Sequence, residues 1–226
     1  MTTHKIIERI ERDAGLPGLT ALLAERLSPT DLQSVLLEVY RQLAQNREPS
    51  EVLSAYETDP LVRPSARSPL DLLAWERSAF AALPPDFEAV ALAPVCPLGT
   101  SSAVALVSQN KVLSTIRNTE VVSDSTNVMA LECAYRRKQL LRAAPKSRTP
   151  IHLAASHRLL RTQQYKGPNL VAHFSAFGLC SAGRDEGSLA FELTTLRRHI
   201  GVYVRALRAF LGSEVILRVA VTDFGP

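Results

Sequence analysis

A hairpin-like pattern in the second half of the chain constrains the fold more than any other feature of the sequence. Two runs rich in apolar residues, 151–164 "IHLAASHRLLRTQQ" and 171–183 "VAHFSAFGLCSAG", flank the short polar segment "YKGPN". Glycine and proline in so short a connection indicate a turn between the two runs. The sequence therefore predicts two adjacent antiparallel strands here.

Helices are expected before this hairpin. The second and third of them begin alike, with Ser28 or Ser68 as a candidate cap and Pro29 or Pro69 at the first helical position, where proline is tolerated. Apolar residues of the second helix fall on one stripe, which is typical of an amphipathic helix. The expected helical ranges are 3–14, 28–46 and 68–83.

From Phe87 onwards the pattern changes to short alternating runs interrupted by two further helices. Strands are expected over 87–95, 101–109, 111–117 and 214–224, and helices over 125–141 and 188–212. The predicted fold is therefore α+β, a mainly antiparallel sheet flanked by helices. We expect an N-terminal helical region, 1–84, and an α+β core, 85–226.

Composition excludes several classes of protein. With 46% hydrophobic and 21% charged residues, the 226-residue chain can bury a core and is not of the disordered type. No apolar run is long enough to span a membrane. Cys96, Cys133 and Cys180 are widely spaced among apolar neighbours, which favours buried free thiols in a reducing compartment over disulfides or a zinc site. A cytoplasmic protein is expected, without metal.

The hairpin also carries candidate ligand-binding side chains. Arg161 ends the first strand, and its planar fork suits a phosphate or carboxylate. His173 and Phe177 lie four residues apart on the second strand, so they share a face. The histidine can add a donor, and the ring can stack on a base. The alternative is an exposed arginine, a half-buried histidine and a core phenylalanine.

A second candidate set precedes the helix expected over 125–141. Arg117, Glu120 and Asp124 surround a predicted strand end just before the helix N-terminus, where an anion or an amino group could be held. The alternative is an ordinary helix start with surface charges. The basic run "YRRKQLLRAAPKSR" could contact an RNA backbone, although such a run is more often a solvated face.

The second half of the chain resembles the catalytic core of class II aminoacyl-tRNA synthetases. The second motif of that family is a strand ending in arginine and an acidic residue, a variable loop, and then arginine or histidine ahead of phenylalanine. The corresponding segments are "LLRTQ", "QYKGPNLVA" and "HFSAF". The nearest pattern is that of histidyl-tRNA synthetase and its noncatalytic relative, the regulatory subunit of ATP phosphoribosyltransferase, and it covers residues 85–226.

The resemblance implies roles for the hairpin residues. Arg161 would hold the α-phosphate of ATP and would be the catalytic residue, His173 would reach the distal phosphates, and Phe177 would stack on adenine. ATP with Mg²⁺ and an amino-acid-like ligand are the implied small molecules, and a homodimer is the implied assembly. Any reaction would be the ATP-dependent activation of a carboxylate.

Two departures from the family pattern limit this expectation. Gln163 stands where the family has an acidic residue, and the glycine-rich third motif with its second ATP-binding arginine has no counterpart. A synthetase without that motif loses a phosphate clamp and the electrostatic stabilisation that it supplies. We therefore expect a synthetase-like paralogue that is not a complete tRNA-charging enzyme. The alternative is a noncatalytic regulatory or scaffold protein that binds an allosteric ligand or a partner protein.

Overall fold

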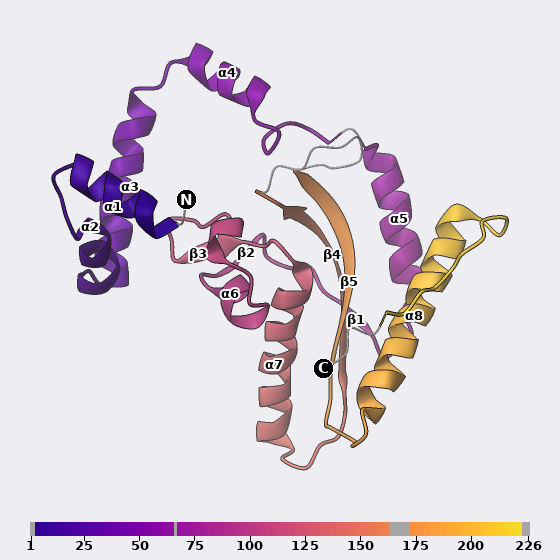
Figure 1. The fold of residues 1–226 in the computed structure, drawn as a ribbon. Helices are drawn as coiled ribbons and strands as arrows, with labels where there is room; N and C mark the ends of the chain where they lie inside the picture. The colour runs from indigo at the N-terminus through magenta and orange to yellow at the C-terminus, as the bar shows by residue number, and fades with distance from the viewer. Residues whose placement is uncertain (1–2, 66, 163–171, 223–226) are drawn as a thin grey trace. The chain divides into compact units, whose positions relative to one another are not determined.

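Two compact units make up the chain. The computed structural model describes residues 3–65, 67–162 and 172–222 (Figure 1). Unit 1 comprises Met1–Asp59 and Ser114–Thr119, and unit 2 comprises Pro60–Leu113 and Glu120–Pro226.

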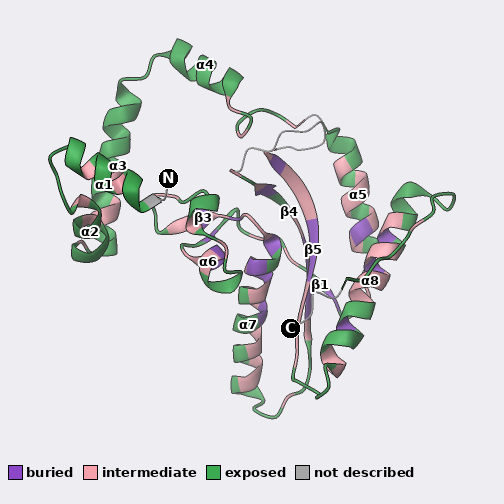
Figure 2. Ribbon diagram, viewed as in Figure 1, coloured by how far each residue is buried: buried purple, intermediate pink, exposed green. Residues whose placement is uncertain are grey.

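Unit 1 is helical, and its helices expose most of their residues (Figure 2). The expected start of the second predicted helix is confirmed, because the Ser28 hydroxyl accepts a hydrogen bond of 3.1 Å from the backbone N–H of Asp31. Pro29 follows at the first helical position. A further helix that the sequence did not predict begins with a reciprocal cap between Glu48 and Glu51. The elements are α1 (Thr3–Asp13), α2 (Leu19–Ala21), η1 (Leu22–Arg26), α3 (Pro29–Gln45) and α4 (Pro49–Thr58).

A three-stranded sheet of order β1-β4-β5 is the centre of unit 2. The predicted hairpin is confirmed: β4 (Ile151–Leu160) and β5 (His173–Ala182) pair antiparallel along their whole length. β1 (Glu88–Ala89) adds a short parallel pairing on the other edge of β4.

Helices cover both faces of this sheet. One face packs against α5 (Pro69–Ala81) and α8 (Ala190–Leu211), and the other packs against α7 (Ser125–Ala143) (Figure 1). Strand alternation divides the side chains between the two cores. Ala154, Phe177 and Leu179 join the α5/α8 core, whereas Leu153, Ala155 and Cys180 join the α7 core. This mixed architecture confirms the α+β class.

Several expected strands are wrong. Within the described residues, 101–109 contains the short helix α6 (Thr100–Val104), 111–117 is not a strand, and 214–222 is irregular. The run 87–95 keeps only β1 and the first residue of β2 (Val95–Pro97), which forms a two-stranded sheet with β3 (Thr119–Val121). No described helix is long and apolar enough to cross a bilayer.

The physical reason for the missing strand at 101–109 is a contact distant in sequence. The carboxylate of Glu120 accepts hydrogen bonds from the backbone N–H groups of Gly99 and Ser101, which turns the chain into α6. Gly99 precedes this helix with a left-handed φ of 89°, which only glycine adopts without strain. Alternation in the sequence cannot reveal such a capping interaction.

Candidate functional site

Arg161 lies at the connected end of the β4–β5 hairpin, directly after the last residue of β4. Its backbone N–H donates to the carbonyl of Ala172 over 2.8 Å, which continues the strand ladder past the Leu160–His173 pair. Its side chain is exposed, and the guanidinium carbon lies 5.1 Å from the centre of the Phe174 ring. Phe174 packs in a cluster with the buried Leu159, so this cation–π pair belongs to the α7-facing side of the sheet.

Phe177 belongs to the opposite face of the sheet and lies in the core. Its side chain is 8% exposed, and its ring makes edge contacts with Trp75, Phe80 and Tyr203 at centroid distances of 6.4, 5.3 and 6.2 Å. Phe177 pairs across the ladder with Ser156, whose hydroxyl donates to the Glu76 carboxylate of α5 over 2.7 Å. The ring that was expected to stack on a base therefore packs between β5, α5 and α8.

His173 is also held by protein groups. It is 9% exposed, its Nδ1 lies 2.7 Å from Nη2 of Arg158, and its Nε2 lies 2.5 Å from the carbonyl oxygen of Arg63. Because arginine can only donate, Nδ1 accepts and Nε2 donates to the carbonyl. The strand places His173 and Phe177 on one face, as predicted, but it places Arg161 on the other.

The residue that the sequence interpretation missed is Phe174. Pairing of Leu160 with His173 puts Arg161 and Phe174 on the same side of the ladder. The alternation of faces along each strand can be inferred from the sequence. Deciding which phenylalanine shares a face with Arg161 also requires the pairing register of the hairpin. The loop residues 163–171, which include Gln163, lie outside the described part of the chain.

Each residue of the second predicted set has its own contacts in the structure. Glu120 is fully buried and accepts hydrogen bonds from Gly99 N (2.9 Å), Ser101 N (2.8 Å) and Gln109 Nε2 (2.8 Å). Burial raises the pKa of Glu120, but the hydrogen bonds from Gln109, Ser101 and Gly99 together outweigh it and leave this pKa below its usual value. The carboxylate is thus an ionised internal cap of α6.

The other two members of that set have separate places. Asp124 caps α7, since its Oδ1 accepts from the backbone N–H and the hydroxyl of Thr126 at 2.8 and 2.7 Å. This confirms the expected helix start. Arg117 is an exposed residue of unit 1, and its backbone N–H donates to the Thr115 hydroxyl. Whether these residues also bind a ligand stays a prediction.

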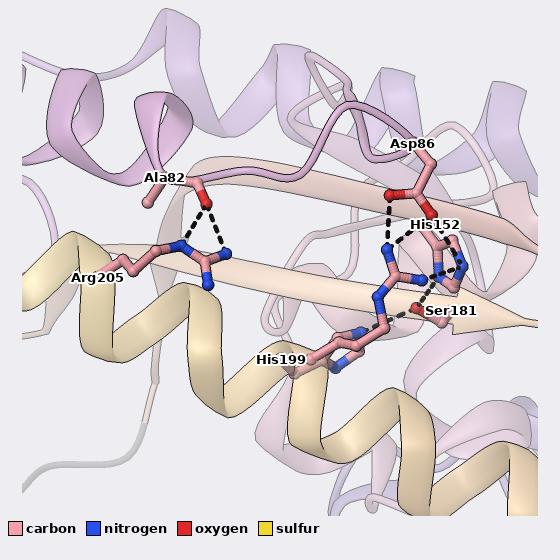
Figure 3. Close-up of polar contacts among 7 residues, drawn as sticks. Ala82, Asp86, His152, Ser181, His199 and Arg205 are labelled. Carbon is pink, nitrogen blue, oxygen red and sulfur yellow. Dashed lines mark hydrogen bonds and ion pairs between the residues drawn. The ribbon is translucent and has the colours of Figure 1, made fainter.

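A polar cluster that the sequence did not indicate lies between the sheet and α8 (Figure 3). The carboxylate of Asp86 accepts hydrogen bonds of 2.5 and 2.6 Å from Arg198, whose Nη1 lies 3.0 Å from Nε2 of His152. Nδ1 of His152 contacts the Ser181 hydroxyl at 2.7 Å, and that hydroxyl lies 2.8 Å from Nε2 of His199. The chain of contacts therefore connects β4, β5 and α8.

Burial and charge fix the protonation states of this cluster. Burial and the positive charge of Arg198 lower the pKa of His152, although Asp86 opposes this. Burial also lowers the pKa of His199, helped by His152 and Arg198. Hydrogen bonds from Arg198 lower the pKa of Asp86. Two neutral histidines therefore lie beside one ionised Arg–Asp pair.

Metal ligands do not gather in the described part of the chain, where no group of three or more histidine, cysteine, aspartate or glutamate side chains could hold an ion. The basic run at the end of α7 is partly engaged in the fold, since Arg137 donates to the carbonyls of Thr149 and Ser147.

No family model matches the sequence, and no match was found among curated proteins. Among solved structures, the chain is similar to a pyrrolysyl-tRNA synthetase from Desulfitobacterium hafniense, with 17% identity and a TM-score of 0.47 over 87% of this chain and 60% of that one. It is also similar to an ATP phosphoribosyltransferase regulatory subunit/histidyl-tRNA synthetase from Bacillus halodurans, with 19% identity and a TM-score of 0.38 over 60% of this chain and 33% of that one.

A third similar structure is the histidyl-tRNA synthetase from Nostoc, with 14% identity and a TM-score of 0.36 over 60% of this chain and 29% of that one. The chain thus spans 60% or less of each of these proteins. The similarity concerns the fold and says nothing of the ligands of this chain.

Proposed function

We propose that the chain is a class II synthetase-like paralogue that binds a nucleotide, or an amino-acid-like small anion, at the end of the β4–β5 hairpin where Leu160 pairs with His173. The observation that carries this proposal is the exposed guanidinium of Arg161, stacked on Phe174 at 5.1 Å. ATP with Mg²⁺ is the proposed ligand. If the chain has an activity, it is the activation of a carboxylate by ATP and not complete tRNA charging.

Stacking prepares Arg161 for anion binding. An arginine held against a ring loses less side-chain entropy when a ligand arrives than a freely rotating one. The N–H groups at the edge of the guanidinium plane can still donate in parallel to two oxygens of a phosphate or carboxylate. A flat base would stack on the outer face of the guanidinium, so that Phe174 would act through Arg161 and not as a direct stacking partner.

A noncatalytic regulatory or scaffold protein is the second candidate. It is supported by Phe177 and His173, which pack inside unit 2 and bond to protein groups. Under this alternative the roles expected of His173 in phosphate binding and of Phe177 in adenine stacking do not exist. Cytoplasmic location and homodimerisation are common to both candidates, and RNA binding by the basic run is a separate proposal.

Calorimetric titration with ATP and Mg²⁺ tests the first candidate. Arg161→Ala should weaken binding about tenfold to a hundredfold, the loss expected for a charge-assisted hydrogen-bonding pair. Phe174→Ala should weaken it less, because the cation remains but is no longer held. Arg197→Ala, which removes another exposed arginine from α8, should leave binding unchanged.

Two outcomes decide between the candidates. An absence of ATP binding, or ATP binding that Arg161→Ala does not alter, contradicts the nucleotide proposal. Amino-acid-dependent exchange of pyrophosphate into ATP contradicts the noncatalytic alternative, because such exchange requires formation of an acyl adenylate.

A further inference from the structure

Two of the three cysteines meet between α7 and the sheet. Cys133 of α7 and Cys180 of β5 are 47 residues apart in sequence, yet their sulfur atoms lie 3.8 Å apart. Both are free thiols, and they share a cluster with the buried residues Met129 and Leu153. Cys96 lies in a different cluster, where its sulfur contacts the backbone carbonyl of Glu120 at 3.7 Å.

The pair is arranged for a covalent link. A disulfide requires a sulfur–sulfur distance of about 2.05 Å, so the two atoms must approach by about 1.8 Å. Rotation about the Cα–Cβ bonds, which moves a cysteine sulfur between staggered positions, can supply much of this approach. The sulfur atoms are already in contact, so no other side chain has to leave the space between them.

We propose that Cys133 and Cys180 form an oxidative modification site, which closes to an intramolecular disulfide when a hydroperoxide reacts with Cys180. The Cys180 thiolate attacks one peroxide oxygen, the O–O bond breaks, and the second oxygen leaves as hydroxide or water. The resulting sulfenic acid is attacked by the sulfur of Cys133, the S–S bond forms, and the S–O bond breaks with release of water. Two thiols and one hydrogen peroxide thus give one disulfide and two waters.

The two cysteines differ in exposure and in acidity, as a reaction in which Cys180 is oxidised before Cys133 attacks it requires. Cys180 is partly exposed, whereas Cys133 is only 2% exposed and can act without meeting the oxidant. The thiol of Cys133 donates to the sulfur of Cys180, which lowers the pKa of Cys180 and raises the pKa of Cys133. The thiolate is therefore favoured on the cysteine that solvent can reach.

The disulfide would join α7 covalently to β5. It would close a chain loop that contains β4 and would prevent α7 from separating from the sheet. This inference rests on the cysteine geometry alone and does not depend on nucleotide binding at Arg161.

Intact-mass spectrometry of the full chain tests the proposal. The reduced, folded protein is treated with hydrogen peroxide, alkylated under denaturing conditions, weighed and mapped by proteolysis. Wild type and the matched control Cys96→Ser should each lose two hydrogen atoms and yield a linked peptide pair containing Cys133 and Cys180. Cys133→Ser and Cys180→Ser should yield no such pair, and Cys133→Ser should accumulate a dimedone-reactive sulfenic acid on Cys180.

Several results would overturn the proposal. These are a folded wild type that gains oxygen without forming the link, a link that involves Cys96 or joins two chains, and dimedone labelling that appears first on Cys133. The wild-type measurement needs no substitution, so the proposal stays testable if a serine variant does not fold. Cys180→Ala, which introduces no buried hydroxyl, provides the second variant.

Discussion

Arg198 of α8 donates a hydrogen bond to Nε2 of the buried His152 over 3.0 Å and thereby fixes the tautomer of that histidine. Because Nε2 accepts, the proton of His152 lies on Nδ1 and is donated to the Ser181 hydroxyl. The hydroxyl proton of Ser181 is then directed to Nε2 of His199. The hydrogen bonds run in one direction from α8 through the sheet and back to α8.

Burial of His152 and His199 makes the stability of the protein depend on pH. The pKa values of His152 and His199 lie below the ordinary value of 6.5 because burial opposes their charged forms. The unfolded chain therefore binds more protons than the folded one as the pH falls below 6.5, and the free energy of unfolding decreases. Each histidine contributes at most about 1.4 kcal/mol per pH unit. The loss ends once the pH is below the folded-state pKa.

Urea denaturation between about pH 8 and about pH 5 measures this effect. His199→Gln should make the decrease in unfolding free energy shallower over the acidic part of that range. His157, whose pKa is also lowered by burial, should account for part of the dependence that remains. Equal slopes in wild type and His199→Gln would contradict the prediction.

Local signals in the sequence were sufficient for much of the fold. Ser28, Ser68 and Asp124 cap the helices that they were expected to start, since each cap depends only on neighbouring residues. The hairpin was also predictable, because a turn between two β-type runs is a local pattern. The helix at 100–104 was not predictable from local signals, because it depends on Glu120, which lies 19 residues beyond Ser101 in the sequence.

The two aromatic residues of β5 should respond differently to truncation. Phe177→Ala should lower the free energy of unfolding by about 3–5 kcal/mol, because it opens a cavity among Trp75, Phe80 and Tyr203. Phe174→Ala should cost only about 1–2 kcal/mol, because its ring is partly exposed. Chemical denaturation of both variants checks this. An equal loss for the two would contradict the assignment of Phe177 to the core and Phe174 to the site.

The site was less predictable than the fold for a related reason. Arg161 was identified because a lone arginine at a strand end is visible in the sequence. Its aromatic partner was not identified, because the choice between Phe174 and Phe177 depends on the pairing of Leu160 with His173. Side-chain facing alternates along a strand, so an error of one residue in register exchanges the two faces.

Glu120 should be essential for stability. Glu120→Ala leaves the N–H groups of Gly99 and Ser101 and the amide of Gln109 without their buried acceptor, and an unsatisfied group costs about 1–3 kcal/mol. We expect a loss of more than about 3 kcal/mol in the free energy of unfolding. Glu120→Gln should lose less, because one oxygen remains. Alanine at the exposed Glu186 is the control, and an equally small effect at both positions would show that Glu120 is not the cap.

Two glycines of unit 2 should respond to alanine in opposite directions. A Cβ at Gly178 of β5 would lie 2.8 Å from Cε of Met129 and 3.0 Å from Oγ of Ser125, both of which are buried residues of α7. Overpacking of this kind costs about 1–3 kcal/mol. A Cβ at Gly201 in α8 would meet only Nη1 of Arg205, at 3.3 Å, and not the Nε and Nη2 atoms that donate to the Ala82 carbonyl. Replacement of a glycine inside a helix by alanine then stabilises by about 0.5–1 kcal/mol.

Thermal unfolding of the two variants is the measurement. The midpoint of Gly178→Ala should fall below that of wild type, and the midpoint of Gly201→Ala should rise above it. In a protein that already carries Met129→Ala, Gly178→Ala should lower the midpoint by less than it does in wild type. The reason is that Met129→Ala removes the atom that the new Cβ meets. If the decreases in midpoint caused by Gly178→Ala and Met129→Ala simply add in the double variant, the close approach of β5 to α7 at Gly178 is not the cause of the destabilisation by Gly178→Ala.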